Sequence, residues 1–178
     1  GTGFDAISFT ANATANFSTA IIGTDVERFF AANSGANTIT LTAAQLGAFE
    51  SVQSGRIIVN GSGIADLSGA VVNTQFFTLG TSVGINLSGV NTTTYDILGG
   101  TGVNTITGSD NGDVIDGAAG NDIINGGNHD DLITGGAGLD TINGDAGGDI
   151  FRITLQADIV AGESYTGGLG RDTLDLET

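Results

Sequence analysis

Acids or amides recur every nine residues between Gly99 and Arg152. Each of six consecutive nonapeptides places one at its sixth position, directly after a glycine-rich stretch. Glycine adopts backbone conformations that side chains obstruct, so such a stretch can aim carbonyl oxygens at the neighbouring carboxylate. Calcium takes six to eight oxygen ligands and mixes carboxylates with carbonyls. The spacing therefore predicts several calcium sites, and the sixth-place residues are Asn104, Asp113, Asp122, Asp131, Asp140 and Asp149.

A large apolar residue stands at the eighth position of every nonapeptide. No helix or ordinary strand repeats every nine residues, whereas a solenoid built from stacked turns does. We expect residues seven to nine to form a short strand, with the eighth residue facing inward and the outer two facing solvent. The predicted core stack is Ile106, Ile115, Ile124, Ile133, Ile142 and Phe151.

The pattern resembles the RTX, or haemolysin-type calcium-binding, nonapeptide repeat GGxGxDxUx over 54 continuous residues. The resemblance implies an all-β fold, a right-handed parallel β-roll with two nonapeptides per turn and calcium between turns stacked 18 residues apart. It implies several Ca²⁺ ions and a weak or vacant site at Asn104 with Asp122, because an amide carries no charge. The bridging pairs that it implies are Asp113 with Asp131, Asp122 with Asp140, and Asp131 with Asp149.

Glycines at positions two and four of the repeat are expected to contribute carbonyl ligands. Position four carries Asn111 and His129 in two repeats, and both residue types tolerate positive φ better than most. We interpret His129, the only histidine, as a turn residue rather than a catalytic one. Position two carries Ser109, Ala118 and Asp145, which should loosen three turns without removing their carbonyls. The glycines predicted to serve as ligands are Gly100, Gly102, Gly120, Gly127, Gly136 and Gly138.

Both ends of the sequence carry partial copies of the motif. GGLGRDTLDL over 167–176 puts Asp172 sixth. GTGFDAISF over 1–9 is the same motif without its first glycine, so Asp5 takes the sixth place. We include both acids among the candidate metal ligands. The matching ends also suggest one period of a longer tandem array.

Residues 1–98 read as β structure throughout, because short runs rich in β-branched and aromatic residues alternate with turn residues. One short helix is predicted at 43–51, where Thr42 and Gln45 can form a capping box. The expected strands are 6–10, 37–42, 56–60, 71–79 and 94–98.

A 20-residue period precedes the nonapeptides. The segment that starts at Leu67 aligns with the one that starts at Leu87, and this places Ile57, Phe77 and Ile97 in phase. We therefore divide the chain into a β-rich segment (1–52), solenoid rungs of about 20 residues (53–98), the calcium roll (99–152) and a C-terminal flank (153–178).

The net charge of −16 excludes two classes of partner, because an acidic surface repels nucleic acid and anionic membrane. Cysteine is absent, so thiolate metal sites are excluded as well. No apolar run reaches the length of a membrane span. Of the 20 acids, nine lie within 99–152, where the only basic residue is Arg152. Their mutual repulsion should keep the calcium-free block disordered, so that calcium binding and folding become one equilibrium.

These features favour a calcium-stiffened structural module of an exported bacterial surface protein, of adhesin or surface-layer type, located outside the cell. The alternative is an accessory domain of a secreted protease, lipase or epimerase whose catalytic domain lies elsewhere. No catalytic constellation is apparent, so we do not expect the chain to be an enzyme. Two other interpretations stay open, namely self-association through solenoid ends and glycan or ice binding by threonine ladders in 1–98.

Overall fold

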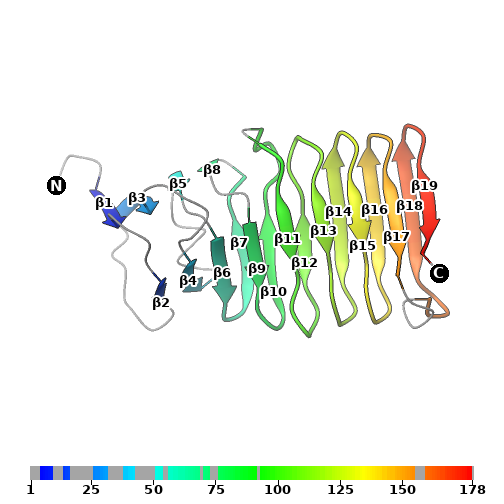
Figure 1. Cartoon of the computed structure of the whole chain (residues 1–178), viewed down its shortest axis with the longest axis horizontal. Coiled ribbons are helices and arrows are strands. Elements are labelled where there is room, and N and C mark those ends of the chain that lie inside the picture. The colour runs from blue at the N-terminus through cyan, green and yellow to red at the C-terminus, as the bar shows by residue number, and fades with distance from the viewer. Residues whose placement is uncertain are drawn as a thin grey trace.

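The computed structural model describes residues 5–9, 14–16, 26–31, 38–42, 51–53, 56–68, 70–72, 76–91, 93–154 and 159–177. They form a β-solenoid, an all-β stack of parallel strands that advances rung by rung along the long axis (Figure 1). The predicted fold class is confirmed. Among the described residues, no helix is long and apolar enough to cross a membrane.

Two parallel sheets form the opposite walls of the solenoid. The longer sheet consists of nine of the described strands, in the order β19-β17-β15-β13-β11-β9-β6-β4-β2. They are β2 (Thr14–Asn16), β4 (Thr38–Thr42), β6 (Arg56–Asn60), β9 (Phe76–Leu79), β11 (Asp96–Leu98), β13 (Val114–Asp116), β15 (Leu132–Thr134), β17 (Ile150–Ile153) and β19 (Thr173–Leu176). The second sheet has six: β7 (Gly63–Asp66), β10 (Val83–Asn86), β12 (Thr105–Thr107), β14 (Ile123–Asn128), β16 (Thr141–Ala146) and β18 (Ser164–Leu169).

A third sheet accompanies the early rungs only. It comprises the described strands β1 (Asp5–Phe9), β3 (Val26–Ala31), β5 (Ser51–Gln53) and β8 (Val71–Val72). The predicted strand at 71–79 is therefore two strands, β8 and β9, which belong to different sheets. Strands β2 and β4 join the longer sheet through β6. The predicted helix at 43–51 lies outside the described residues except for Ser51, where β5 begins.

Strand register shows how the rung length changes along the chain. Ile57 lies opposite Phe77, and Phe77 opposite Ile97, so the predicted 20-residue phase is confirmed. From Ile97 onward the longer sheet advances by 18 residues, through Ile115 to Ile133. The last rung is longer, because Phe151 lies opposite Leu174, 23 residues later. Two nonapeptides thus make one turn of the roll, and the final turn contains five additional residues.

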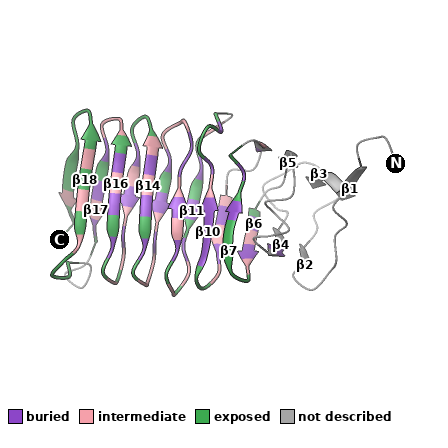
Figure 2. Cartoon of the chain, turned by 180° about the vertical axis from the view of Figure 1, so that it is seen from behind, coloured by how far each residue is buried: buried purple, intermediate pink, exposed green. Residues whose placement is uncertain are grey.

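The core is a double stack of the eighth-position residues, as predicted. The six side chains are at most 4% exposed and continue the apolar stack that begins in the 20-residue rungs (Figure 2). The seventh-position residues Val114 and Ile123 are both 47% exposed, because successive side chains of a strand point to opposite faces. The core is therefore one residue thick on each wall, so each rung depends on its neighbours.

Neighbouring isoleucines in β14 offer a matched test of this core. Ile124 is 0% exposed and Ile123 is 47% exposed. We expect Ile124→Ala to reduce the free energy of unfolding of the calcium-loaded chain by about 2–5 kcal/mol, since it opens a cavity between two rungs. Ile123→Ala should cost less than about 1 kcal/mol. Urea denaturation in excess calcium measures both, and equal losses would place the core elsewhere.

Candidate metal centre

The sixth-position residues form two columns, one in each row of turns. We call them the Asp131 column (Tyr95, Asp113, Asp131, Asp149 and Asp172) and the Asp140 column (Asn104, Asp122 and Asp140). Within a column, each backbone N–H donates to an Oδ1 of the residue one rung later. The N···O distances are 2.7 Å from Asp113 to Asp131, 2.8 Å from Asp122 to Asp140 and 2.9 Å from Asp131 to Asp149. The pairs predicted to bridge are therefore direct neighbours.

The second carboxylate oxygen of several column residues has no hydrogen-bond partner. Oδ2 of Asp122, Asp131 and Asp149 is buried and unbonded, in residues at most 2% exposed. A buried carboxylate oxygen without a donor costs several kcal/mol unless a cation meets it. These atoms are the strongest sign in the structure that a cation belongs in the turns.

Backbone oxygens converge on the same places. A Cβ on Gly117 would lie 2.7 Å from Asp122 Oδ2 and 2.5 Å from the carbonyl oxygen of Gly135, one rung later. A Cβ on the first-position glycines Gly126 and Gly144 would likewise lie against Oδ2 of Asp131 and of Asp149. Carboxylate and carbonyl oxygens from successive rungs therefore surround a space that only a glycine leaves open. This donor set suits calcium, which prefers hard oxygen ligands.

The glycines named from the sequence fall into two groups. Four of them, Gly120, Gly127, Gly136 and Gly138, have positive φ and lie against a carbonyl group of the preceding rung. Gly100 and Gly102 are not among the positive-φ residues. The sequence prediction missed the first-position glycines, although their invariant place before the turn was visible in all six repeats.

Gly138 offers a test of the close approach between rungs. Its φ is +147°, and a Cβ there would overlap the carbonyl group of Gly120. Gly63 has a φ of +92° with no atom within 4 Å of the same point, so it isolates the cost of backbone conformation. We expect Gly63→Ala to cost about 1–2 kcal/mol. Gly138→Ala should cost clearly more in thermal unfolding with calcium present, and equal costs would refute close packing of the turns.

Burial and the charges of neighbouring carboxylates raise the pKa of Asp131 and of Asp122. Burial, followed by the charges of Asp113, Asp149 and Asp130, raises the pKa of Asp131 to about 8. Burial and the nearby Asp140 and Asp116 raise the pKa of Asp122 to about 6. Such shifts mean that the ionised columns lack compensating positive charge. A cation from solution is the natural compensation.

Burial also raises the pKa of two further carboxyls, Asp113 and Asp149. The one basic residue of the nonapeptide block, Arg152, pairs with Glu177 at 3.2 Å. In the described part of the chain, no three His, Cys, Asp or Glu side chains gather round one point. A calcium ion here would therefore depend on backbone carbonyls for most of its ligands.

The candidate acids at the ends of the chain differ from each other. Asp172 joins the Asp131 column, because its Oδ1 accepts the N–H of Asp149 at 3.1 Å across the longer last rung. Asp5 begins β1, in the third sheet, which contains none of the repeat strands. The structure therefore brings Asp172 to the candidate site and does not bring Asp5 there.

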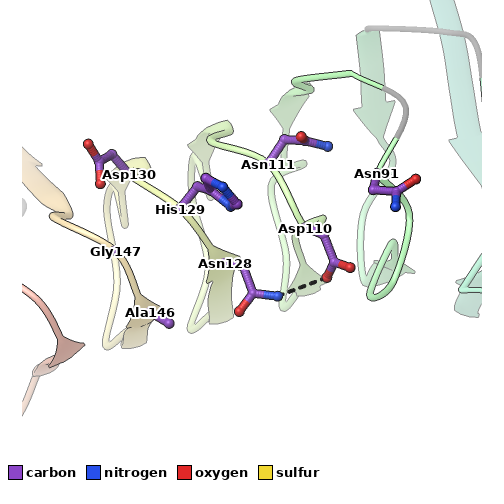
Figure 3. Close-up of a pocket in the computed structure, with 8 residues that line it drawn as sticks. All are labelled: Asn91, Asp110, Asn111, Asn128, His129, Asp130, Ala146 and Gly147. Atoms are coloured by element: carbon purple, nitrogen blue, oxygen red, sulfur yellow. Dashed lines mark hydrogen bonds between the residues drawn. The ribbon is translucent and has the colours of Figure 1, made fainter.

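Several other polar residues line a groove along one row of turns, and they are Asn91, Asp110, Asn111, Asn128, His129 and Asp130 (Figure 3). His129 has a φ of 69°, as expected for a turn residue, whereas Asn111 is not among the positive-φ residues. Asp110 Oδ1 accepts the side-chain amide of Asn128 at 3.0 Å, and Asp130 Oδ1 accepts the N–H of Gly148 at 2.7 Å. These two acids connect successive turns.

Glu163 is a candidate ligand that sequence reasoning missed. Register places it one rung after Asp140, since Ser164 lies opposite Thr141. Its Oε1 is buried without a hydrogen-bond partner, and its Oε2 accepts the hydroxyl of Tyr165 at 3.2 Å. The segment DIVAGESYT (158–166) is thus a degenerate nonapeptide with Glu sixth and Tyr eighth. The repeat was missed because this segment contains only one glycine and because the longer last rung moves it out of phase with the six nonapeptides.

The fold is a parallel β-roll in which carboxylate and carbonyl oxygens come together between the turns. The family described as RTX calcium-binding nonapeptide repeat (4 copies) matches residues 98–131 and 119–151. Residues 98–151 therefore consist of RTX calcium-binding repeats, which imply calcium as the ligand. No curated protein and no solved structure shows significant similarity to the chain.

Proposed function

We propose that Asp122, Asp131, Asp140 and Asp149 hold calcium ions between successive turns, and that Asp172 closes the Asp131 column. The observation that supports this most strongly is the buried Oδ2 of Asp122, Asp131 and Asp149, which has no hydrogen-bond partner although Oδ1 of the same carboxylate accepts a backbone N–H. Each carboxylate thereby serves two purposes. Its Oδ1 fixes the spacing of the rungs, and its Oδ2 is left for the ion, together with carbonyl oxygens of the glycine turn.

Calcium then builds the roll and performs no chemistry. A chain with net charge −16 and 31 glycines pays both electrostatic repulsion and backbone entropy on folding. Ion binding offsets both costs, so binding energy becomes folding energy. Extracellular calcium modules bind at roughly 0.1–1 mM. We infer a module of an exported bacterial surface protein, unfolded where calcium is scarce and rigid outside the cell.

Limited proteolysis of the whole chain at two calcium levels tests this function. At about 0.1 µM free calcium, we expect cleavage throughout residues 117–151, because the carboxylate columns repel each other. At about 1–2 mM calcium the same segment should resist cleavage. Magnesium at equal concentration is the control, since its small octahedral shell suits a carbonyl cage poorly. Identical digestion patterns at both calcium levels would contradict the proposal.

A further inference from the structure

The first two nonapeptide turns are built differently from the later ones. In the turns 99–104 and 108–113, the second-position N–H donates back to the sixth-position side chain. Gly100 N–H reaches Asn104 Oδ1 at 2.8 Å, and Ser109 N–H reaches Asp113 Oδ2 at 2.7 Å. We call these two the closed turns. Their carboxylate or amide oxygens already have donors.

The later turns are open in this sense. Their second-position residues have positive φ, among them Ala118 at 69° and Asp145 at 71°. This conformation directs their N–H groups elsewhere, to Asp116 Oδ1 at 2.9 Å and to Asn143 Oδ1 at 3.3 Å. In these two turns the Oδ2 of Asp122 and of Asp149 therefore has no hydrogen-bond donor. The fourth position differs in the same way, because Gly120, His129, Gly138 and Gly147 have positive φ whereas Gly102 and Asn111 do not.

Asn104 supplies what a cation would otherwise supply. Its Nδ2 donates to the carbonyl oxygens of Gly80 at 3.1 Å and Val83 at 2.6 Å, on the preceding rung. The residue is 0% exposed. An amide group thus satisfies converging carbonyls with two N–H donors and no charge. An aspartate at this place would present a second oxygen to both carbonyls, which is repulsive unless an ion lies between them.

Asp113 is satisfied by a different set of donors. Its Oδ1 accepts the N–H of Tyr95 at 2.8 Å and the hydroxyl of Ser109 at 3.1 Å. The Asp131 column begins one rung earlier, at Tyr95. This residue is 1% exposed and donates its hydroxyl to the Val72 carbonyl at 3.1 Å. The Tyr95 ring lies 6.1 Å from that of Phe77. Both columns therefore start in groups that need no ion.

We infer that the closed turns, 99–104 and 108–113, fold without calcium and form a metal-independent platform on which the calcium roll assembles. Asn104 and Ser109 determine where calcium binding begins. The platform also presents the N–H groups of Asn104 and Asp113, which donate to Asp122 and Asp131 at 2.7 Å each. It thereby orients the first carboxylate of each column for its ion. This inference deepens the proposed function and depends on calcium binding in the open turns.

Hydrogen exchange of the full chain, followed by mass spectrometry, tests the platform directly. Without calcium, amides of 79–116 should exchange slowly and those of 123–151 fast, and calcium should slow only the second group. Equally fast exchange of both groups in chelator would overturn the inference. Slow exchange of 123–151 in chelator would instead refute the proposed function, so the two failures are distinguishable.

The substitution Asn104→Asp provides a second, independent readout. In chelator we expect exchange in 99–116 to accelerate on the order of 10- to 100-fold, because two donors are lost and a charge is buried. In calcium, protection should return with one more bound ion per chain, counted by native mass spectrometry. Asn121→Asp is the matched control, since Asn121 is exposed and uses only its Oδ1, which accepts the N–H of Leu139 at 2.9 Å. Unchanged exchange and ion count in Asn104→Asp would overturn the inference.

Discussion

Asp131→Asn should destabilise the calcium-loaded roll and stabilise the calcium-free one. Asp131 lies in the middle of its column and is 2% exposed, and its neighbours on the adjacent rungs are the carboxylates of Asp113 and Asp149. Its pKa of about 8 shows that the protein without an ion disfavours the negative charge. An amide removes that charge, so the calcium-free state should gain about 1–3 kcal/mol at pH 8. Calcium affinity should fall at least about 100-fold, since even indirect partners of a metal are worth 10- to 100-fold.

Asp130→Asn is the neighbouring control. Asp130 is exposed, and its Oδ1 accepts the N–H of Gly148 at 2.7 Å, a bond that an amide oxygen preserves. It should change calcium affinity by less than about tenfold, through long-range charge alone. Isothermal calcium titration measures the affinity, and the circular dichroism signal of β structure in chelator reports the stability of the calcium-free roll. Destabilisation of Asp131→Asn in both conditions would mean that this carboxylate is structural and not a ligand.

Protons should compete with calcium for the columns. The pKa of Asp131 is raised to about 8 and that of Asp122 to about 6, both above the ordinary value of 3.8. The folded calcium-free roll therefore binds protons that the unfolded chain releases. Its added stability is complete below about pH 4 and is lost as the pH rises through 6 and then 8. Calcium needs the ionised carboxylates, so its affinity should show the opposite trend.

Circular dichroism at a series of pH values checks this competition. In chelator the β-structure signal should be larger at pH 5 than at pH 8, because the protonated columns oppose folding less. The calcium concentration at half-folding should rise about tenfold for each pH unit below 8, per linked carboxylate. Asp131→Asn should flatten both dependences above pH 6. A calcium midpoint independent of pH between 5 and 8 would show that the columns are ionised without the ion.

The periodicity predicted the parts of the fold that repeat. Eighth-position residues such as Ile115 and Ile133 are in the core, and sixth-position acids stack 18 residues apart. The 20-residue phase of Ile57, Phe77 and Ile97 became strand register. These features follow from a stack, because any two equivalent residues must face each other. A period in the sequence therefore predicts which residues face each other on successive rungs.

The difference between closed and open turns could not be predicted from residue types. Ser109 and Ala118 occupy the same repeat position and are both small, yet only Ala118 has positive φ. In the closed Ser109 turn, Asp113 Oδ1 accepts the Ser109 hydroxyl at 3.1 Å and the N–H of Tyr95 at 2.8 Å, and the second of these is a contact with the preceding rung that residue types do not reveal. Glu163 was missed for a related reason. The five additional residues shifted the phase, and only the pairing of β16 with β18 restored it.

The most direct test of the account is a calcium titration of the whole chain that follows fold and ion count together. Far-ultraviolet circular dichroism reports β structure, and equilibrium dialysis with ⁴⁵Ca²⁺ reports bound ions. We predict that the signal of the roll appears in step with ion binding, over the closed-turn signal that persists in chelator. Full β structure in chelator, with ions binding later and without a spectral change, would contradict the claim that calcium builds this roll.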